Sequence, residues 1–405
     1  MGISRRLSRP SIRAARRVAL MALLCQSFPI AALAAAPAAR PPSAQAATCI
    51  ENAGTLPARA APPFRAQSIA TFDYPWAIAF LPDQRLLVTE KPGRMFLVTQ
   101  GGHKTEISGV PKVYYRGQDG LLDVAVSPDF THDAALYFTY VEPEAQGGGS
   151  LVLARARLEV AEKGPLLRDL TTIWRQSPPS RGGQPGGIIA FAPDGRHLFL
   201  SVGDRQEPDT AQDPDLARGK ILRMNLDGSA PPDNPMAREA GIRALTWSTG
   251  HRNPYGLAFA PDGQLWEHEM GPRGGDELNR IQRGGNYGWP YVSYGDQYSG
   301  EPIPRPPTRP EFVEPALYWN PVIAPAGMAF YSGTLFPAWR GSALIGGLHS
   351  AGLVRIVFTG DGCARQVDRW TLGRRIRDVA VAPDGALWVI EDRTGGSLLR
   401  LTPKQ

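Results

Sequence analysis

A short phrase that recurs along the chain limits the possible folds more than any other feature. Each copy has an alternating apolar run, then Pro-Asp and a turn, then a second alternating apolar run. Proline presets such a turn and a period of two indicates strands, so each copy predicts a β-hairpin. The five clear copies are centred on Pro82-Asp83, Pro128-Asp129, Pro193-Asp194, Pro261-Asp262 and Pro383-Asp384, and a degenerate copy runs from Met328 to Gly346.

The spacing of the copies predicts an all-β fold, a six-bladed β-propeller over residues 64–405. Copies lie about 45 to 75 residues apart, the spacing of four-stranded blades with insertions. No stretch has a long helical period, which disfavours a helical solenoid. A β-sandwich would alternate in the same way, but the repeat favours radial closure. Segments 204–250 and 270–325 are rich in Gly, Pro, Asp and Asn, and loops of this kind form the channel mouths where propellers bind ligands.

The N-terminal 47 residues predict a secretory signal peptide. Residues 1–17 contain six arginines and no acid, an apolar run follows from Val18 to Leu24, and small residues fill 43–47. A membrane anchor is the weaker interpretation, because Gln26 to Pro29 interrupt the apolar stretch. We therefore expect an exported protein, periplasmic or secreted and not membrane-spanning after cleavage. Residues 48–63, rich in Pro and Ala, are expected to be a poorly ordered tail.

Removal of this segment also changes the charge and the cysteine count. The whole chain has a net charge of +6, but residues 1–47 carry seven arginines and no acid, which leaves the rest near −1. The high isoelectric point is therefore no sign of nucleic-acid binding. Cys49 and Cys363 are left, and in an oxidising compartment they could form a disulfide. Spacing alone does not exclude two separate thiols.

Arginines in two loop phrases are candidates for anion binding. Arg252 lies in Gly-His-Arg-Asn-Pro, and Arg375 and Arg377 lie in Arg-Arg-Ile-Arg-Asp. Guanidinium groups clamp carboxylates in a bidentate fashion, so arginines that converge on one channel would favour a small polyanion. The alternative is that each arginine pairs with a nearby acid and only ties its loop down.

These phrases, in this order, resemble the soluble aldose sugar dehydrogenases that use pyrroloquinoline quinone (PQQ), the glucose/sorbosone dehydrogenase family. The resemblance runs from Phe64 to Pro403 and includes the long phrase Gly-Pro-Arg-Gly-Gly-Asp-Glu after Met270. It implies a six-bladed propeller that oxidises aldoses to lactones by hydride transfer to PQQ and passes electrons to an unidentified acceptor. A lactonase-type hydrolase on the same architecture is a weaker alternative, because it would need a central calcium held by several side chains.

The resemblance also implies the residues of the site. Asp204 would orient a catalytic base, and Arg252 could stabilise negative charge that develops on the quinone. The residues that would contact PQQ are Gln118, Arg252, Asn253, Tyr298, Gly347, Leu348, His349, Arg375 and Arg377. Calcium (Ca2+) would be bound by the backbone carbonyls of Gly271 and Pro272, and a further calcium by Glu277 and Tyr287. Alternatively, Glu277 forms a loop salt bridge with Arg273 or Arg280.

The catalytic base itself departs from the family pattern. Gln184 occupies the position of the family's base histidine, and an amide oxygen is too weakly basic to accept a proton near neutral pH. Ile188 replaces an arginine, and Met270 follows Glu269 where the family has histidine. Either another group such as His268 or His349 is the base, or the chain binds PQQ or a carbohydrate with little or no turnover. Both histidines could also be ordinary solvated loop residues.

Overall fold

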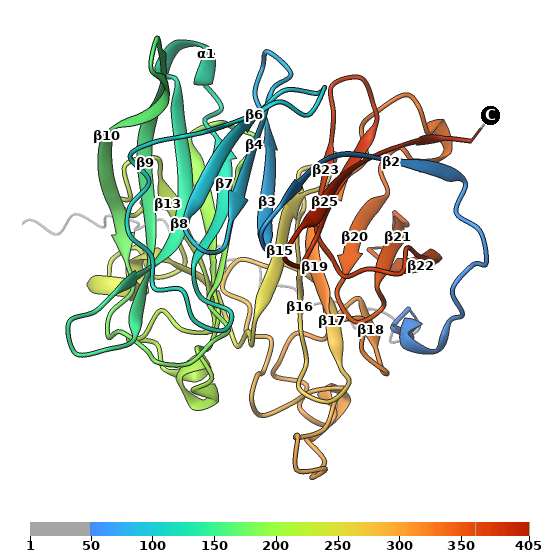
Figure 1. Ribbon diagram of the computed structural model, residues 1–405. Coiled ribbons are helices and arrows are strands. Elements are labelled where there is room, and N and C mark those ends of the chain that lie inside the picture. Colours follow the sequence, from blue (N-terminus) through green and yellow to red (C-terminus); the bar gives the residue numbers. More distant parts are fainter. Residues whose placement is uncertain (1–48, 361, 405) are drawn as a thin grey trace, which may run out of the picture. The chain divides into compact units, whose positions relative to one another are not determined.

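The computed structural model describes residues 49–360 and 362–404. The predicted signal peptide lies outside the described residues. The described chain forms six separate sheets, five of four strands and one of five, arranged in a ring (Figure 1). The predicted six-bladed β-propeller is confirmed. None of the helices in residues 49–360 and 362–404 has the length and hydropathy to cross a membrane.

Five blades are built mainly from four consecutive strands each. Blade 1 contains β3 (Pro75–Phe80), β4 (Leu86–Glu90), β5 (Arg94–Val98) and β6 (Lys104–Glu106). Blade 2 contains β7 (Leu121–Val126), β8 (Ala135–Pro143), β9 (Gly149–Ala161) and β10 (Gly164–Arg175). Blade 3 contains β11 (Gly186–Phe191), β12 (His197–Val202), β13 (Lys220–Asn225) and β14 (Thr246–Thr249). Blade 4 contains β15 (Pro254–Phe259), β16 (Leu265–Glu269), β17 (Asp276–Arg280) and β18 (Leu317–Trp319). Blade 5 contains β19 (Pro325–Phe330), β20 (Ala343–Gly347), β21 (Gly352–Phe358) and β22 (Ala364–Thr371). The helices are short: α1 (Phe130–Asp133) and the 3-10 turns Ala53–Thr55, Pro208–Gln212, Gly241–Leu245, Pro306–Thr308 and Pro337–Trp339.

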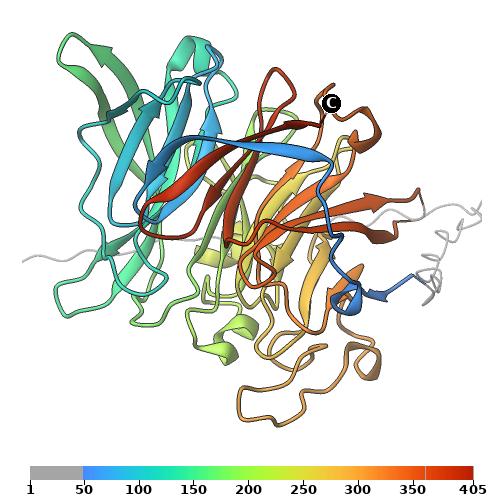
Figure 2. The ribbon, with the colours of Figure 1, turned by 45° about the vertical axis from the view of Figure 1, so that its right-hand side comes forward.

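Strands from both ends of the described chain close the ring in blade 6. This blade combines β23 (Ile376–Val381), β24 (Leu387–Glu391) and β25 (Gly396–Pro403) with β2 (Phe64–Phe72). β2 pairs antiparallel with β25 from Phe64 opposite Pro403 to Phe72 opposite Gly396, and Figure 2 shows the blue strand lying along the dark red one. Because every blade then packs between two neighbours, the described chain leaves no sheet face open where it begins and ends.

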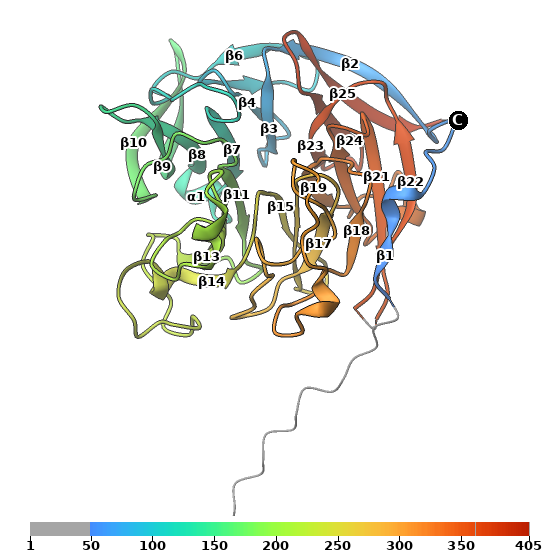
Figure 3. The same ribbon diagram turned by 90° about the horizontal axis from the view of Figure 1, so that it is seen from below.

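The first strand of each blade lines the central channel, as the view along the ring shows (Figure 3). The repeated Pro-Asp turns join first strands to second strands, for example β3 to β4 and β15 to β16. All of these turns therefore lie on one face of the ring. The starts of the first strands and the ends of the second strands meet on the opposite face, which is where the polar loop phrases lie.

The segment before β2 differs from the poorly ordered tail that we expected. Cys49 forms a disulfide with Cys363, with the two Cα atoms 5.5 Å apart. β1 (Glu51–Asn52) adds a fifth, parallel strand to blade 4 by pairing with β18. The side chain of Asn52 accepts hydrogen bonds from the backbone of Gly54 (3.0 Å) and Asn320 (2.9 Å). A covalent link, strand pairing and side-chain hydrogen bonds thus anchor a segment whose composition alone suggested a linker.

Candidate active site

A cavity of about 310 Å³ opens at the channel mouth, on the face where first strands begin and second strands end. It is lined by Trp76, Lys91, Gly117, Gln118, Tyr255, Met270, Ala324, Leu348, Arg375, Arg377 and Asp392. The structure therefore brings together four of the predicted cofactor residues: Gln118 from the loop before β7, Leu348 from the turn after β20, Arg375 from the loop before β23, and Arg377 from β23 itself.

The two arginines of this cavity share one acid. Asp392 accepts hydrogen bonds from Arg375 (2.8 Å) and from Arg377 (2.9 Å). Burial alone would raise the pKa of Asp392, but Arg377 and Arg375 hold it below its ordinary value. The local ion pairing that we considered as an alternative is therefore present, but the single carboxylate of Asp392 cannot neutralise both arginines. Lys91 is a third cation in the cavity lining, and its ammonium group donates to the carbonyl of Gly117 (3.0 Å).

Arg377 has hydrogen-bond donors that no described residue satisfies. Its side chain is 8% exposed and lies over the ring of Trp76, 4.3 Å from the ring centroid. The Nε and Nη1 atoms are buried and have no hydrogen-bond partner among the described residues. Buried donors are normally satisfied, so two free donors on a cationic group that lines the cavity point to an anionic ligand.

Gln184 occupies the position expected for the base and is held there from both sides. Its backbone is left-handed (φ 55°), and its N–H donates to Oε1 of Gln118 at 2.5 Å. With its amide nitrogen oriented towards Asp204, the side chain donates to Oδ1 of that residue (2.5 Å) and accepts from Nη2 of Arg252 (2.8 Å). Asp204 thus orients the amide of Gln184.

Asp204 is a buried carboxylate, 1% exposed, directly behind Gln184. Its Oδ2 accepts from the indole of Trp289 at 2.9 Å. Burial raises the pKa of Asp204 to about 6, although the positive charge of Arg252 acts in the opposite direction. At neutral pH the group is mainly an anion, and the amide of Gln184 bridges it to Arg252.

Arg252 has no ion pair with a carboxylate in the described part of the chain. It donates from Nη1 to the carbonyls of Met270 (2.8 Å) and Gly271 (3.0 Å), and its guanidinium lies over the rings of Trp289 and Tyr298. Tyr298 itself is 73% exposed, at the rim of the site. Two carbonyls and the Gln184 amide fix the guanidinium, and none of these neutral partners removes its positive charge.

The predicted calcium residues lie around a second, much smaller cavity. Gly271, Glu277 and Tyr287 line it together with Glu269, whereas Pro272 is buried beside it without belonging to the lining. The phenol of Tyr287 donates to the carbonyl of Arg280 (2.6 Å) and accepts from the N–H of Gln282 (2.9 Å). Tyr287 can therefore offer a cation only its backbone carbonyl.

Glu277 does not form the salt bridge that we considered as its alternative role. In the described residues it has no ion pair with Arg273 or Arg280, and Arg280 donates to Gln264 instead (2.9 Å). Burial raises the pKa of Glu277 well above its ordinary value, and the charge of Glu269 adds to this. Two buried carboxylates and nearby carbonyl oxygens form a donor set that fits a hard cation.

His268 is not a loop residue, and neither of our interpretations of it is correct. It lies in the middle of β16, is 0% exposed, and burial lowers its pKa to about 3. An added Cβ on Gly256 would lie 2.0 Å from its Nε2, so the ring fills the space over that glycine. A histidine packed between strands cannot reach a substrate at the mouth. His349 is exposed, in the turn that follows Gly347 and Leu348 after β20.

A family model covers nearly all of the propeller: the Glucose / Sorbosone dehydrogenase model matches residues 72–400. The chain belongs to this family. It is 39% identical over 345 residues to the aldose sugar dehydrogenase YliI of Escherichia coli strain K12, over 82% of this chain and 91% of that protein. The family resemblance of the loop phrases is therefore confirmed.

Solved structures with the same fold include two aldose sugar dehydrogenases. The apo-form of the soluble enzyme from Escherichia coli superposes with a TM-score of 0.78 at 37% identity, over 84% of this chain and 100% of that chain. The PQQ-bound form of the enzyme from Streptomyces coelicolor superposes with a TM-score of 0.68 at 30% identity, over 85% and 100%.

Several residues of this glucose/sorbosone dehydrogenase site were not predicted. They are Trp76, Lys91, Tyr255, Trp289 and Asp392. A signal for two of them exists in the repeat: Lys91 and Asp392 directly follow the second strands β4 and β24, as Met270 follows β16 and Leu348 follows β20. Aligning the blades by their second strands would have placed all four positions at the mouth.

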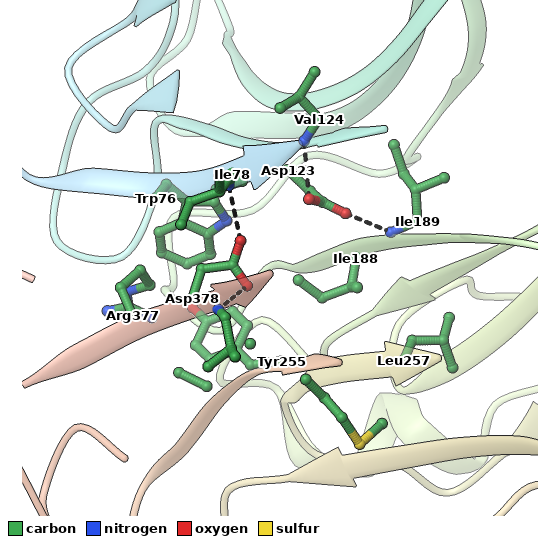
Figure 4. Close-up of a pocket in the computed structure, with 15 residues that line it drawn as sticks. Trp76, Ile78, Asp123, Val124, Ile188, Ile189, Tyr255, Leu257, Arg377 and Asp378 are labelled. Carbon is green, nitrogen blue, oxygen red and sulfur yellow. Dashed lines mark hydrogen bonds between the residues drawn. The ribbon is translucent and has the colours of Figure 1, made fainter. Parts of the chain in front are cut away.

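A third cavity, of about 180 Å³, lies deeper in the channel of this family member (Figure 4). Trp76, Tyr255 and Arg377 line both cavities. Asp123 and Asp378 line the deeper one, and burial raises their pKa values to about 6 and about 8, with the charge of Asp123 adding to the shift of Asp378. Ile188 also lines this cavity and adds an apolar side chain beside the two acids.

Proposed function

We propose that this chain is an exported, PQQ-dependent oxidoreductase that oxidises aldose sugars to lactones, with turnover limited by Gln184. The observation that carries the proposal is the pair of buried, unused guanidinium nitrogens of Arg377 at a mouth lined by three cations and one acid. The cofactor's carboxylates match this charge, and the PQQ-bound relative supports the assignment.

The residues divide into those that would hold the cofactor and those that would act on the sugar. Arg377 and Arg375 would bind cofactor carboxylates, with Gln118 and Leu348 beside them. PQQ, when bound, supplies the hydride acceptor. Arg252, fixed by two carbonyls, would donate hydrogen bonds to an oxygen that gains negative charge. Calcium would be held by Glu277 and Glu269 with the backbone oxygens of Gly271 and Tyr287.

Gln184 sets the rate in this proposal. Its amide fills the space between Asp204 and Arg252 and accepts no proton, so the sugar hydroxyl must lose its proton to water or to Asp204. The competing candidate is a propeller that binds PQQ or a carbohydrate without turnover. It is favoured by the fact that both ends of the Gln184 amide are already satisfied.

Replacement of Gln184 by histidine tests the proposal. The protein is loaded with PQQ and calcium, and sugar-dependent reduction of a dye is followed. We expect a slow wild-type rate that Gln184→His raises by about 10²–10⁴-fold, the usual contribution of a positioned base. Gln184→Asn, which keeps an amide, is the matched control and should stay slow.

Two outcomes would contradict parts of this proposal. If wild type and Gln184→His both bind PQQ but neither reduces dye with any aldose, the chain is a binding protein. If the wild-type rate is high and Gln184→His leaves it unchanged, another group is the base.

Export is the second part of the proposal, and the disulfide between Cys49 and Cys363 supports it because such links persist in oxidising compartments. N-terminal sequencing of protein recovered from the periplasm or medium should begin close to residue 48. Recovery only from the cytoplasm with residues 1–47 attached would contradict export.

A further inference from the structure

A cluster of buried polar side chains lies beneath the loop that carries Arg252 and Asn253. Glu267 and Glu269 are two residues apart on β16 and so point to the same side of the strand. Asn279 lies directly opposite Glu267 on β17, and His251 reaches the cluster from the loop before β15. The four side chains are between 0% and 4% exposed, so water does not solvate their charges.

The distances from His251 to the two carboxylates are long for hydrogen bonds. Nδ1 of His251 lies 3.4 Å from Oε1 of Glu269 and 3.8 Å from Oε2 of Glu267. One ligand atom from each of the three residues lies within 4.8 Å of the others. Hydrogen bonds from N–H to O are shorter, at about 2.7–3.2 Å. Two ligands bound at about 2.0–2.1 Å to a tetrahedral metal lie about 3.4 Å apart.

The second nitrogen of His251 is already fixed. Nε2 lies 2.9 Å from the hydroxyl of Ser248, which is itself buried. When Nε2–H donates to this hydroxyl, Nδ1 carries a lone pair that faces the two carboxylates. Metal-binding histidines are oriented in this way, by a hydrogen bond from the ring nitrogen that does not bind the metal.

Two oxygens of the cluster also lack a partner. Oε1 of Glu267 and Oδ1 of Asn279 are buried and accept no hydrogen bond from any described residue. The Asn279 amide nitrogen donates to Glu267 (3.0 Å), which places the amide against the carboxylates. In the described part of the chain no lysine or arginine side chain forms an ion pair with Glu267 or Glu269. Buried carboxylates in such surroundings need a proton or a bound cation.

We propose that His251, Glu267 and Glu269, with Asn279 as a further oxygen donor, bind one divalent transition-metal ion of the zinc type. An imidazole ligand favours zinc and its neighbours over calcium, which takes oxygen ligands only. Glu269 also lines the small cavity of the proposed calcium residues Gly271, Glu277 and Tyr287, whereas His251, Glu267 and Asn279 do not. The proposed ion would therefore be centred on ligands outside the calcium set, and it would use no atom of PQQ.

The metal would support the loop above it. Oε2 of Glu269 accepts hydrogen bonds from the backbone N–H groups of Arg252 and Asn253. A metal bound to the same carboxylate would fix Glu269, and through it the two residues that would line the quinone. The ion would thus position the loop without touching substrate.

Metal analysis of the full-length purified protein tests this site. After exhaustive dialysis against metal-free buffer, we expect about one zinc ion per chain by mass spectrometry of the metals. Glu267→Gln, which changes one ligand and keeps the side-chain shape, should lose most of this zinc. Glu90→Gln is the matched control, because Glu90 is a buried glutamate at the end of β4, outside the cluster. Glu277→Gln should also retain zinc.

A second measurement uses wild-type protein alone and does not depend on how the variant folds. Protein stripped with a strong chelator should melt at a lower temperature, regain its melting temperature with one equivalent of Zn2+, and give the intense visible spectrum of four-coordinate Co2+ when cobalt is added. The proposal is overturned if dialysed wild type holds no zinc and neither Zn2+ nor Co2+ shifts its melting temperature. Recovery with Ca2+ alone would also overturn it and would make the cluster part of the calcium site.

Discussion

The arginines at the mouth differ in how many of their hydrogen-bond donors already have a partner within the protein. Arg375 is largely exposed and donates with two nitrogens to Asp392, whereas Arg377 is buried and gives Asp392 only one of its nitrogens. Two nitrogens of Arg377 find no acceptor in residues 49–360 and 362–404. Arg377 is therefore the arginine whose replacement should affect an anionic ligand most.

Arg377→Lys should weaken PQQ binding by about 10- to 150-fold, because a hydrogen bond to a charged group contributes about 1.5–3 kcal/mol and lysine cannot replace the fork of donors. Titration of PQQ followed by quenching of tryptophan fluorescence measures the affinity. Arg374→Lys is the control, since Arg374 is exposed and donates only to the adjacent Gly373 carbonyl. Equal affinity of Arg377→Lys and wild type would show that the cofactor does not use this arginine.

The sequence predicted site residues correctly where they lie in polar loop phrases. It did not predict which residues are buried by packing between strands. Gln118, Arg375 and Arg377 lie in polar phrases and all line the mouth. His268 follows a glutamate in a polar run, yet every residue of β16 is buried. Second strands of a propeller are covered on both faces, so the alternation that separates inward from outward residues is lost there.

Elements at the edge of the propeller depend on contacts between distant parts of the chain. β1 is only two residues long and pairs with β18 across more than half the chain. The Pro/Ala-rich composition of this segment gave no signal for a strand. Such an element is stable only because its neighbours hold it, and one of these contacts is a disulfide between residues 314 positions apart in sequence.

Removal of this disulfide should lower the free energy of unfolding by about 2–4 kcal/mol, because the cross-link restricts the unfolded chain. The double variant Cys49→Ser with Cys363→Ser should show the loss in urea unfolding followed by tryptophan fluorescence. The wild type in a reducing agent should behave like the double variant, while the reducing agent should not affect the variant itself. A double variant as stable as wild type would mean that β1 pairing alone anchors the segment.

On the scale of the whole molecule, two acids hold neighbouring blades together in the central channel. Asp378 on β23 accepts from the N–H of Ile78 on β3 (2.8 Å), and Asp123 on β7 accepts from the N–H of Ile189 on β11 (2.8 Å). Figure 4 shows both carboxylates in the same cavity. The first of these bonds crosses the junction of blades 6 and 1, where the ring closes.

These acids make the stability of the ring depend on pH. In the folded chain the pKa values of Asp378 and Asp123 are about 8 and about 6, above the ordinary 3.8 of an aspartate. Between about pH 4 and about pH 8 the folded chain therefore keeps protons that the unfolded chain has released, so the free energy of unfolding falls as pH rises through this window. Above the folded pKa values this contribution no longer changes.

Asp378→Asn should make this decline shallower, because asparagine stays neutral at every pH. Between about pH 5 and about pH 8 the difference between variant and wild type should change by about 1–4 kcal/mol in favour of the variant. Urea unfolding at several pH values measures it, with Asp262→Asn in an exposed Pro-Asp turn as the control that keeps the wild-type slope. If Asp378→Asn kept the same slope, Asp378 would be ionised throughout, and the closure of the ring would rest on a charged carboxylate hydrogen-bonded to two backbone N–H groups.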